Sequence, residues 1–342
     1  MTKCILIDPP YKSYYDNKLF DEKDNKLNRD HVLRPFINIK KYFSKYNIAV
    51  HTVDKFFKND LCYKNYYYFS FGIRDNYKYL KNFTNVNLSG FIVLEPPLIG
   101  QKIYKSLEQI SNFFSKVFLL NTIGDGYNKN LVNKNKLELF YHPHSFLKVH
   151  DEYWKNNKRK EMVIINGNKS SMSSKELYSK RIEALLNLNR FFNVDLYGTN
   201  WNKISKDNLS WIYLKNYKNI NKLYRGVCDS KFEILKNYKF SICFENSEVT
   251  GYVSEKIYDC FYVGTIPIYL GAPNISDLIP SNTYIDFKKF KDYKSIALEL
   301  NDFDIEKIEE FKNNARSFLA GKKNEKFYYS FINIIKKTIN IY

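Results

Sequence analysis

The chain has few of the residues on which cross-linked and metal-binding proteins depend. Its 342 residues include five cysteines, at positions 4, 62, 228, 243 and 260, and no two are spaced as C-x-x-C. This pattern fits neither a disulfide framework nor a zinc site, and it indicates a reducing compartment. His142 and His144 have no third ligand type nearby, so we expect loop residues there and no metal site.

Long hydrophobic runs are also missing. No segment approaches the roughly 18 uninterrupted apolar residues that a membrane-spanning helix needs. The apolar run that starts at Cys4 is far too short for a signal peptide. We therefore expect a soluble, cytoplasmic protein.

Acidic residues are outnumbered, with 36 Asp and Glu against 54 Lys and Arg, for a formal net charge of +18. Such a charge is typical of proteins with an anionic partner. A proteome biased toward AT-rich codons would also be rich in Lys, Asn, Ile, Tyr and Phe, and 30 Tyr and 27 Phe are present. Because no basic run or RNA-binding signature accompanies the charge, we expect no nucleic-acid partner.

Short, nearly continuous apolar runs alternate with helical or polar stretches in the first half. Such runs are typical of parallel strands that are covered on both faces. The predicted strands are 4–8, 48–54, 66–73, 90–95 and 116–121.

The pattern starts again after a charged run at 155–161, which is interpreted as a linker. The second set of predicted strands is 162–167, 193–198, 239–245, 265–271 and 283–287. Two successive sets predict an α/β protein with two doubly wound, Rossmann-like domains facing across a cleft. We expect domains at 1–155 and 156–320, followed by a basic amphipathic tail at 321–342. The tail could lie on an anionic membrane surface, or it could pack back on the first domain as a last helix.

The stretch CFENSEVTGYVSEK, residues 243–256, joins a predicted strand to a helix that should begin near Ser254 and end at Gly264. A loop at the carboxyl end of a parallel strand is where α/β proteins bind ligands, and a helix N-terminus attracts phosphate. Lys256 in the first turn is unfavourable for the helix itself, unless an anionic ligand binds there. A solvated surface lysine is the alternative.

Two further charged residues stand out. On a helical wheel of 174–192, Arg181 lies in the middle of an apolar arc formed by Leu177, Ala184, Leu185, Leu188 and Phe192. It either snorkels, pairs with a buried acid or holds a ligand oxyanion. Glu95 ends a buried-type strand before Pro96 and Pro97, and a carboxylate there could serve as a general base or have no catalytic role.

The segments FSICFENS, GYVSEKIYDCF, GTIPIYLGAPNISDLIP and YIDF resemble the α-1,3/4-fucosyltransferases of glycosyltransferase family 10. The resemblance is dense over 238–290, looser back to Arg181, and faint at LEPP, residues 94–97. It implies a GT-B arrangement and inverting transfer of fucose from GDP-fucose to a hydroxyl of an oligosaccharide or glycolipid acceptor. Protein glycosylation and lipopolysaccharide O-antigen synthesis are processes in which such a soluble, bacterial-type enzyme would act.

The resemblance also assigns residues. Lys256 and Arg181 should neutralise the GDP pyrophosphate, Glu255 should contact the ribose, and Tyr252 and Asn246 should line the donor pocket. Glu95 should be the catalytic base, although LEPP stands where eukaryotic members have ESP. An α-1,3 linkage to GlcNAc or Glc is expected, with no metal ion or other cofactor, since fixed cations can stabilise the leaving diphosphate.

Three alternatives remain from the sequence. The same fold could transfer a different nucleotide-activated sugar. The chain could be a basic nucleic-acid-binding protein, or a degenerate transferase that binds its donor without turnover. The expected location is cytoplasmic, with possible peripheral contact of residues 321–342 at the inner face of the membrane.

Overall fold

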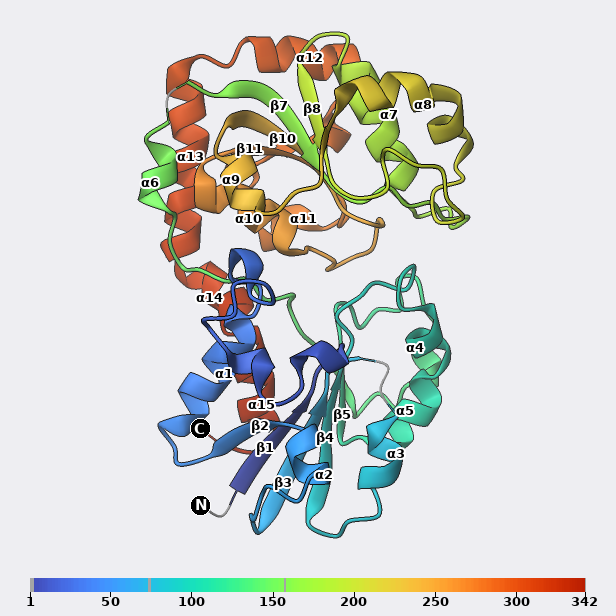
Figure 1. The fold of residues 1–342 in the computed structure, drawn as a ribbon, viewed down its shortest axis with the longest axis vertical. Helices are drawn as coiled ribbons and strands as arrows, with labels where there is room; N and C mark the ends of the chain where they lie inside the picture. The colour runs from blue at the N-terminus through green and yellow to red at the C-terminus, as the bar shows by residue number, and fades with distance from the viewer. Residues whose placement is uncertain (1–2, 73–74, 157, 342) are drawn as a thin grey trace. The chain divides into compact units, whose positions relative to one another are not determined.

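Figure 1 shows the computed structural model, which describes residues 3–72, 75–156 and 158–341. The chain divides into two compact units. The first unit comprises residues 1–145 and 325–342, and the second unit comprises residues 146–324. The first unit is therefore built from two separate stretches of sequence, unlike the predicted division at 155/156 and 320/321.

The first unit contains a six-stranded sheet in which every strand pair is parallel. Its strands, in spatial order, are β2 (Ala49–Thr52), β1 (Lys3–Asp8), β3 (Asn65–Ser70), β4 (Val86–Ile92), β5 (Lys116–Leu119) and β6 (Leu137–Leu139). Alternate residues of one strand serve opposite faces, since Cys4 and Leu6 belong to one hydrophobic cluster while the neighbouring Ile5 is equally buried outside it.

Helices cover both faces of this sheet. The first unit contains α1 (Arg34–Ser44), α2 (Asp54–Phe57), α3 (Asn76–Leu80), α4 (Gln101–Lys105), α5 (Leu107–Phe113) and α15 (Ser330–Thr338), and α14 (Lys322–Tyr328) leads into it. The cluster that contains Cys4 and Leu6 also contains Tyr77 of α3 and Ile110 of α5. α1 and α15 pack against each other (Figure 1).

The apolar side of α15 is buried inside the first unit. The ring of Phe331 lies 4.9 Å from the ring of Phe36 and 4.8 Å from that of Phe71, measured between centroids. Ile332 and Ile335 are also buried, whereas Lys337 is exposed and pairs with Glu138. The C-terminal segment therefore adopts the second of its two expected arrangements, that of a last helix packed on the first unit.

The second unit contains another sheet of six parallel strands. In spatial order they are β12 (Ile285–Asp286), β11 (Ile266–Leu270), β10 (Tyr238–Phe244), β7 (Lys160–Ile165), β8 (Val194–Tyr197) and β9 (Tyr224–Gly226). From β7 the chain runs outward through β8 to β9, and it then returns so that β10 pairs with the other edge of β7. The point between β7 and β10, where the strand order reverses, is where doubly wound sheets bind ligands.

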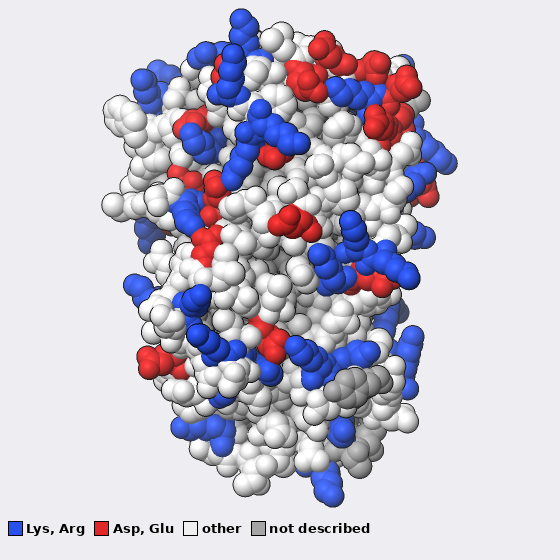
Figure 2. Space-filling view, turned by 180° about the vertical axis from the view of Figure 1, so that it is seen from behind, with Lys and Arg blue, Asp and Glu red and all other residues white. Residues whose placement is uncertain are grey.

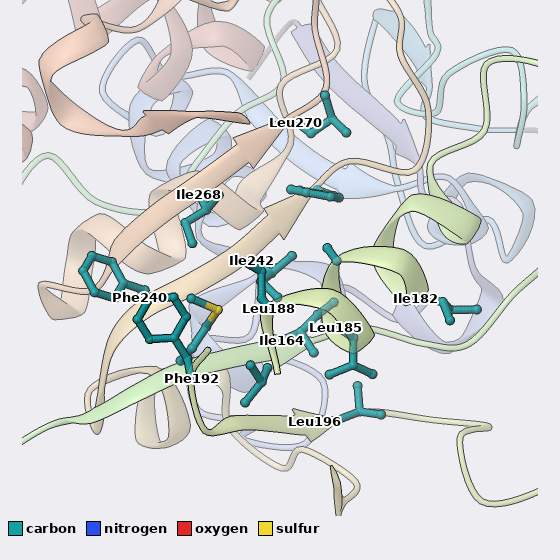
Figure 3. Packing of buried hydrophobic residues seen from close by; sticks show 14 of the residues in the cluster. Ile164, Ile182, Leu185, Leu188, Phe192, Leu196, Phe240, Ile242, Ile268 and Leu270 are labelled. Carbon is teal, nitrogen blue, oxygen red and sulfur yellow. The ribbon is translucent and has the colours of Figure 1, made fainter. Parts of the chain in front are cut away.

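The helices of the second unit also form two layers. They are α6 (Asp151–Trp154), α7 (Tyr178–Leu188), α8 (Trp211–Leu223), α9 (Lys231–Leu235), α10 (Glu255–Val263), α11 (Ile275–Leu278), α12 (Tyr293–Asn301) and α13 (Ile305–Ala320). Leu185 and Leu188 of α7 meet Ile164 of β7 and Ile242 of β10 in one hydrophobic core (Figure 3). α9 and α13 instead pack against α10. The sheet is thus covered on both faces, as its continuous apolar strands predict.

The ten predicted strands all correspond to observed ones, with ends that differ by a few residues. The prediction at 66–73 matches β3, which ends at Ser70, and residue 73 lies outside the described residues. The predicted linker at 155–161 is partly wrong, because Lys160 and Glu161 already belong to β7, and residue 157 is not described. β6 and β9 were not predicted, because each has three residues and lies at the edge of its sheet.

Within the described residues, no helix combines the length and apolar character needed to cross a bilayer. The face drawn in Figure 2 carries lysine and arginine side chains in separate groups, interrupted by uncharged surface and by acidic side chains. The described lysine and arginine side chains on that face therefore form no continuous basic stripe of the kind that a nucleic-acid-binding surface would present.

Candidate functional site

A cavity of about 210 Å³ lies at the carboxyl ends of β7 and β10, where the strand order reverses. Its wall takes in parts of β7, β10, α7, α9 and α10, all within the second unit. Four of the predicted donor-binding residues line it, namely Arg181, Asn246, Glu255 and Lys256. The position agrees with the ligand site expected for a doubly wound sheet.

α10 begins and ends where the sequence predicts. Ser254 precedes its first residue, and Gly264 follows its last residue in the left-handed conformation, with φ +73°. Glu255 and Lys256 in the first turn line the cavity, so the N-terminal end of α10 adjoins it. The free N–H groups and the positive dipole end of a helix N-terminus favour an anionic ligand there.

Arg181 on α7 is held by backbone and amide oxygens. Its side chain is buried, with 2% of the residue exposed. Nε and Nη2 donate to the carbonyl oxygen of Phe244, at 3.2 and 2.8 Å, and Nη2 also donates to Oδ1 of Asn246 at 2.9 Å. Within the described residues, Arg181 therefore neither snorkels nor forms an ion pair with an acid, and its guanidinium is fixed at the cavity wall. Burial lowers its pKa, but an arginine remains protonated at neutral pH.

Lys256 sits beside a carboxylate that sequence reasoning did not single out. Its Nζ donates to Oε2 of Glu245 at 3.1 Å and to Oγ of Ser254 at 2.8 Å. Burial lowers the pKa of Lys256, the carboxylates of Glu245 and Glu255 raise it, and the net direction is upward. The side chain is 21% exposed, so the ammonium is a partly buried, protonated group at the cavity wall.

Glu255 belongs to a second charged group on α10. Nζ of Lys231 on α9 contacts Oε1 of Glu255 at 3.0 Å and Oδ2 of Asp259 at 2.8 Å. Glu255 and Asp259 are one helical turn apart and share a face of α10. Lys231 thus bridges two acids, and all three residues line the cavity.

Asn246 and Tyr252, both predicted to line the donor pocket, differ in their position relative to the cavity. Asn246 lines the cavity and donates through Nδ2 to the hydroxyl oxygen of Tyr252 at 3.1 Å. Tyr252 is 3% exposed and is absent from the cavity wall that the structure describes. Its nearness to the cavity is therefore indirect, through the amide that also accepts from Arg181.

Glu95 lies in the first unit, three residues beyond the end of β4. The strand ends at Ile92, so the prediction that Glu95 ends a strand is wrong by three residues. Pro96 begins a tight turn, and its carbonyl oxygen accepts from the N–H groups of Ile99 and Gly100 at 2.9 Å. Glu95 itself is exposed, and its main-chain oxygen accepts from the hydroxyl of Tyr104 at 3.1 Å.

The described residues hold no group of three or more His, Cys, Asp or Glu side chains that could bind a metal ion. Arg181, Lys256 and the N-terminus of α10 adjoin this cavity, and Lys169 and Lys231 also line it. These are groups that bind a diphosphate.

The family match to known proteins lies within the second unit. Residues 154–313, within the second unit apart from its ends, match the model of the C-terminal region of glycosyltransferase family 10 (fucosyltransferase). Over 64 residues the chain is 41% identical to an alpha-(1,3)-fucosyltransferase of Helicobacter pylori, which is 19% of this chain and 13% of that protein. Over 78 residues it is 38% identical to GDP-fucose protein O-fucosyltransferase 3 of Xenopus laevis, which is 22% of this chain and 17% of that protein.

The chain also resembles solved structures in fold. A crystal structure of an alpha1,3-fucosyltransferase superposes with a TM-score of 0.52 at 14% identity, over 99% of this chain and 90% of that one. At this identity the likeness concerns the fold, which is GT-B-like with two Rossmann-like α/β units. Residues 154–313 are thus similar to the C-terminal region of glycosyltransferase family 10.

Proposed function

We propose that the protein is an inverting fucosyltransferase that moves L-fucose from GDP-fucose to a hydroxyl group of an acceptor glycan without a metal ion. The observation that carries the proposal is the cavity at the β7–β10 reversal, where Arg181, Lys256 and the start of α10 converge. The family match over 154–313 and the GDP-fucose named for the Xenopus relative favour this donor.

In the proposed reaction, Glu95 accepts the proton of the acceptor hydroxyl as that oxygen attacks the anomeric carbon. The bond from this carbon to the diphosphate oxygen breaks, and GDP leaves with the electron pair. Negative charge therefore grows on the diphosphate, where Arg181, Lys256 and the N–H groups of α10 can stabilise it. Cations held in place before the reaction need little reorganisation, which makes such stabilisation effective.

The position of a described residue supports each proposed donor contact. Glu255 would accept hydrogen bonds from the ribose hydroxyls, since its carboxylate lines the cavity. Asn246 would contact the donor directly, while Tyr252 would act on the donor through Asn246. The proposed acceptor is an oligosaccharide or glycolipid with GlcNAc or Glc, joined by an α-1,3 linkage, and the first unit would bind it.

A cytoplasmic location with peripheral contact at the inner membrane face stays a prediction. The apolar side of α15 is buried on the first unit, so contact through 321–342 would depend on exposed lysines such as Lys337 and not on insertion of that side. Co-sedimentation with anionic and neutral vesicles would test it. Binding to the anionic vesicles alone, weakened by salt, is the expected result.

The test of the main proposal is turnover of a donor panel by the purified chain, with EDTA present. The panel contains GDP-fucose, GDP-mannose, UDP-glucose and UDP-GlcNAc, with N-acetyllactosamine and lactose as acceptors. We expect release of GDP from GDP-fucose alone, and an approximately 10²–10⁴-fold lower kcat for Glu95→Gln because a general base is lost. KM for GDP-fucose should change little, since Glu95 lies outside the donor cavity.

Other outcomes separate the alternatives. Turnover of a UDP-sugar would keep the fold and replace the donor. Binding of GDP without turnover of any donor would favour a degenerate transferase. Tight, salt-sensitive binding of oligonucleotides without nucleotide-sugar binding would favour a nucleic-acid-binding protein.

A further inference from the structure

Glu245 is a fully buried carboxylate at the carboxyl end of β10, and the function proposed above gives it no role. Its main-chain N–H donates to the carbonyl oxygen of Leu270 on β11 at 2.8 Å, which fixes its position. Gly271 leaves the space that its side chain occupies, since a Cβ atom there would lie 2.5 Å from Cγ of Glu245. The residue that follows β11 thus leaves room for this carboxylate.

The two oxygens of Glu245 are used by the start of α10. Oε1 accepts from the main-chain N–H of Ser254 at 2.7 Å. Oε2 accepts from the hydroxyl of Ser254 at 2.8 Å and from Nζ of Lys256 at 3.1 Å. The hydroxyl of Ser254 in turn accepts from Nζ of Lys256 at 2.8 Å, so it links the other two groups.

Ser254 does not cap α10 in the usual way. A serine before a helix commonly accepts from a main-chain N–H of the first turn, but the side chain of Ser254 makes no such bond. Its hydroxyl faces Glu245 and Lys256 instead. These contacts hold the ammonium of Lys256 in place.

We infer that Glu245 is a positioning residue for the diphosphate site, which holds the ammonium of Lys256 at the cavity wall directly and through Ser254. The inference rests on the proposed function, since it assumes that Lys256 meets the diphosphate of a nucleotide. A carboxylate that only stabilised the fold would not be expected to alter ligand binding through Lys256.

The charges around Lys256 make the inference testable by pH. Glu245 at the end of β10, Glu255 on α10 and Arg181 on α7 act on its ammonium, while Lys231 and Asp259 line the same cavity. Burial and Arg181 lower the pKa of Lys256, and the two carboxylates raise it. Without the charge of Glu245, Lys256 should lose its proton at a lower pH than in the native protein.

The experiment measures GDP binding by calorimetry between pH 7 and 10 for the full chain and for Glu245→Gln, Ser254→Ala and Glu248→Gln. Glu248 is the matched control, because it lies in the same loop and pairs with Lys288 outside the cavity wall. Each variant is compared with the native chain at the same pH, so that titration of GDP itself cancels.

We expect Glu245→Gln to bind GDP at least about tenfold more weakly at pH 7.5, and the loss should grow as the pH rises. Ser254→Ala, which removes only the linking hydroxyl, should show a smaller loss, and Glu248→Gln should bind as the native chain does. If Glu245→Gln does not fold, the GDP affinity of Ser254→Ala still tests the inference. Equal GDP affinity and equal pH profiles for native, Glu245→Gln and Ser254→Ala chains would overturn the inference.

A double-mutant cycle with Lys256→Met separates positioning from a general effect on the fold. If Glu245 acts through Lys256, Glu245→Gln should have almost no further effect on GDP affinity once Lys256 is methionine. An undiminished effect in the Lys256→Met background would overturn the inference. If the native chain itself does not bind GDP, the proposed function fails first, and that result is distinct from both outcomes.

Discussion

Lys231 is the side chain that joins the two acids of α10, Glu255 and Asp259, beside the proposed donor. Burial lowers the pKa of Lys231, and the carboxylates of Asp259 and Glu255 raise it. The net direction is upward, so Lys231 stays protonated. A protonated amine at 3.0 Å from Oε1 of Glu255 restricts the rotamers of that carboxylate. If Glu255 contacts the ribose as proposed, Lys231 should therefore determine the orientation of its carboxylate.

Replacing Lys231 by methionine tests this role at the scale of one residue. Lys231→Met should weaken the binding of GDP more than that of 2′-deoxy-GDP, because the carboxylate of Glu255, which we propose accepts from the ribose hydroxyls, is no longer held. Competition binding with both nucleotides gives the ratio of their affinities, which should fall toward one. Lys236→Met is the control, since Lys236 pairs with Glu233 and lies outside the cavity wall. An unchanged ratio in Lys231→Met would show that Glu255 needs no such support.

Sequence reasoning identified the residues of the site that carry an unusual feature for their position. Lys256 is a cation at the wrong end of a helix, and Arg181 is a charge within an apolar arc whose members Leu177, Ala184, Leu185, Leu188 and Phe192 are all buried. Glu245 and Lys231 have no such local signal. The burial of Glu245 depends on Leu270 at the end of β11 and on Gly271 directly after it, and the role of Lys231 depends on how α9 packs on α10.

At the scale of elements, Asp195 on β8 connects strands across the sheet of the second unit. Oδ2 accepts from Nζ of Lys160 on β7 at 3.1 Å and from the hydroxyl of Tyr238 on β10 at 2.7 Å. Oδ1 accepts from Nε of Arg225 on β9 at 2.6 Å. Burial raises the pKa of Asp195, while Tyr238, Lys160 and Arg225 lower it, and the net direction is downward.

This lowered pKa predicts a pH dependence of stability. A carboxyl group whose pKa is lower in the folded state stabilises the fold above its unfolded pKa, about 3.9, and loses this effect as the pH falls through the folded value. Asp195→Asn should therefore lower the free energy of unfolding by about 1–3 kcal/mol at pH 7. The difference from the native chain should stay nearly constant from pH 5 to 8 and shrink below pH 4. Urea unfolding at several pH values would measure it, and a difference that grew in acid would contradict the assignment.

The elements themselves were largely predictable, because continuous apolar runs are a strong signal for buried parallel strands. α10 was predicted closely, with a start near Ser254 and an end at Gly264. The helix expected over 174–192 is shorter, as α7 begins at Tyr178. The main-chain N–H of Leu177 donates to the carbonyl oxygen of Asn246, so residues before α7 pair with the donor loop, and no sequence periodicity reports such a contact.

At the scale of the whole molecule, α15 ties the end of the described chain to the first unit. Phe331→Ala removes a ring that is 2% exposed and packs on Phe36 and Phe71. We expect unfolding of the first unit to become easier by about 3–5 kcal/mol. Hydrogen exchange, followed by mass spectrometry, would show the loss of protection in α1 and β4.

The same variant should leave the second unit unaffected. Stabilisation of residues 146–324 by GDP should match that of the native chain, since a ligand stabilises the unit that binds it. Asn333→Ala, an exposed position of α15, is the matched control and should change neither unit. Equal loss of protection in both units would instead mean that they unfold as one cooperative body.

The separation of the first unit into two stretches has a consequence for how the protein is made. A ribosome adds roughly 5–20 residues per second, and domains generally fold as units during synthesis. Residues 1–145 therefore wait on the order of ten seconds or more for α15, while the whole of the second unit is being synthesised. During that interval Phe36 and Phe71 lack the ring that covers them in the finished protein. The first unit can thus complete its fold only after the whole of the second unit has been synthesised.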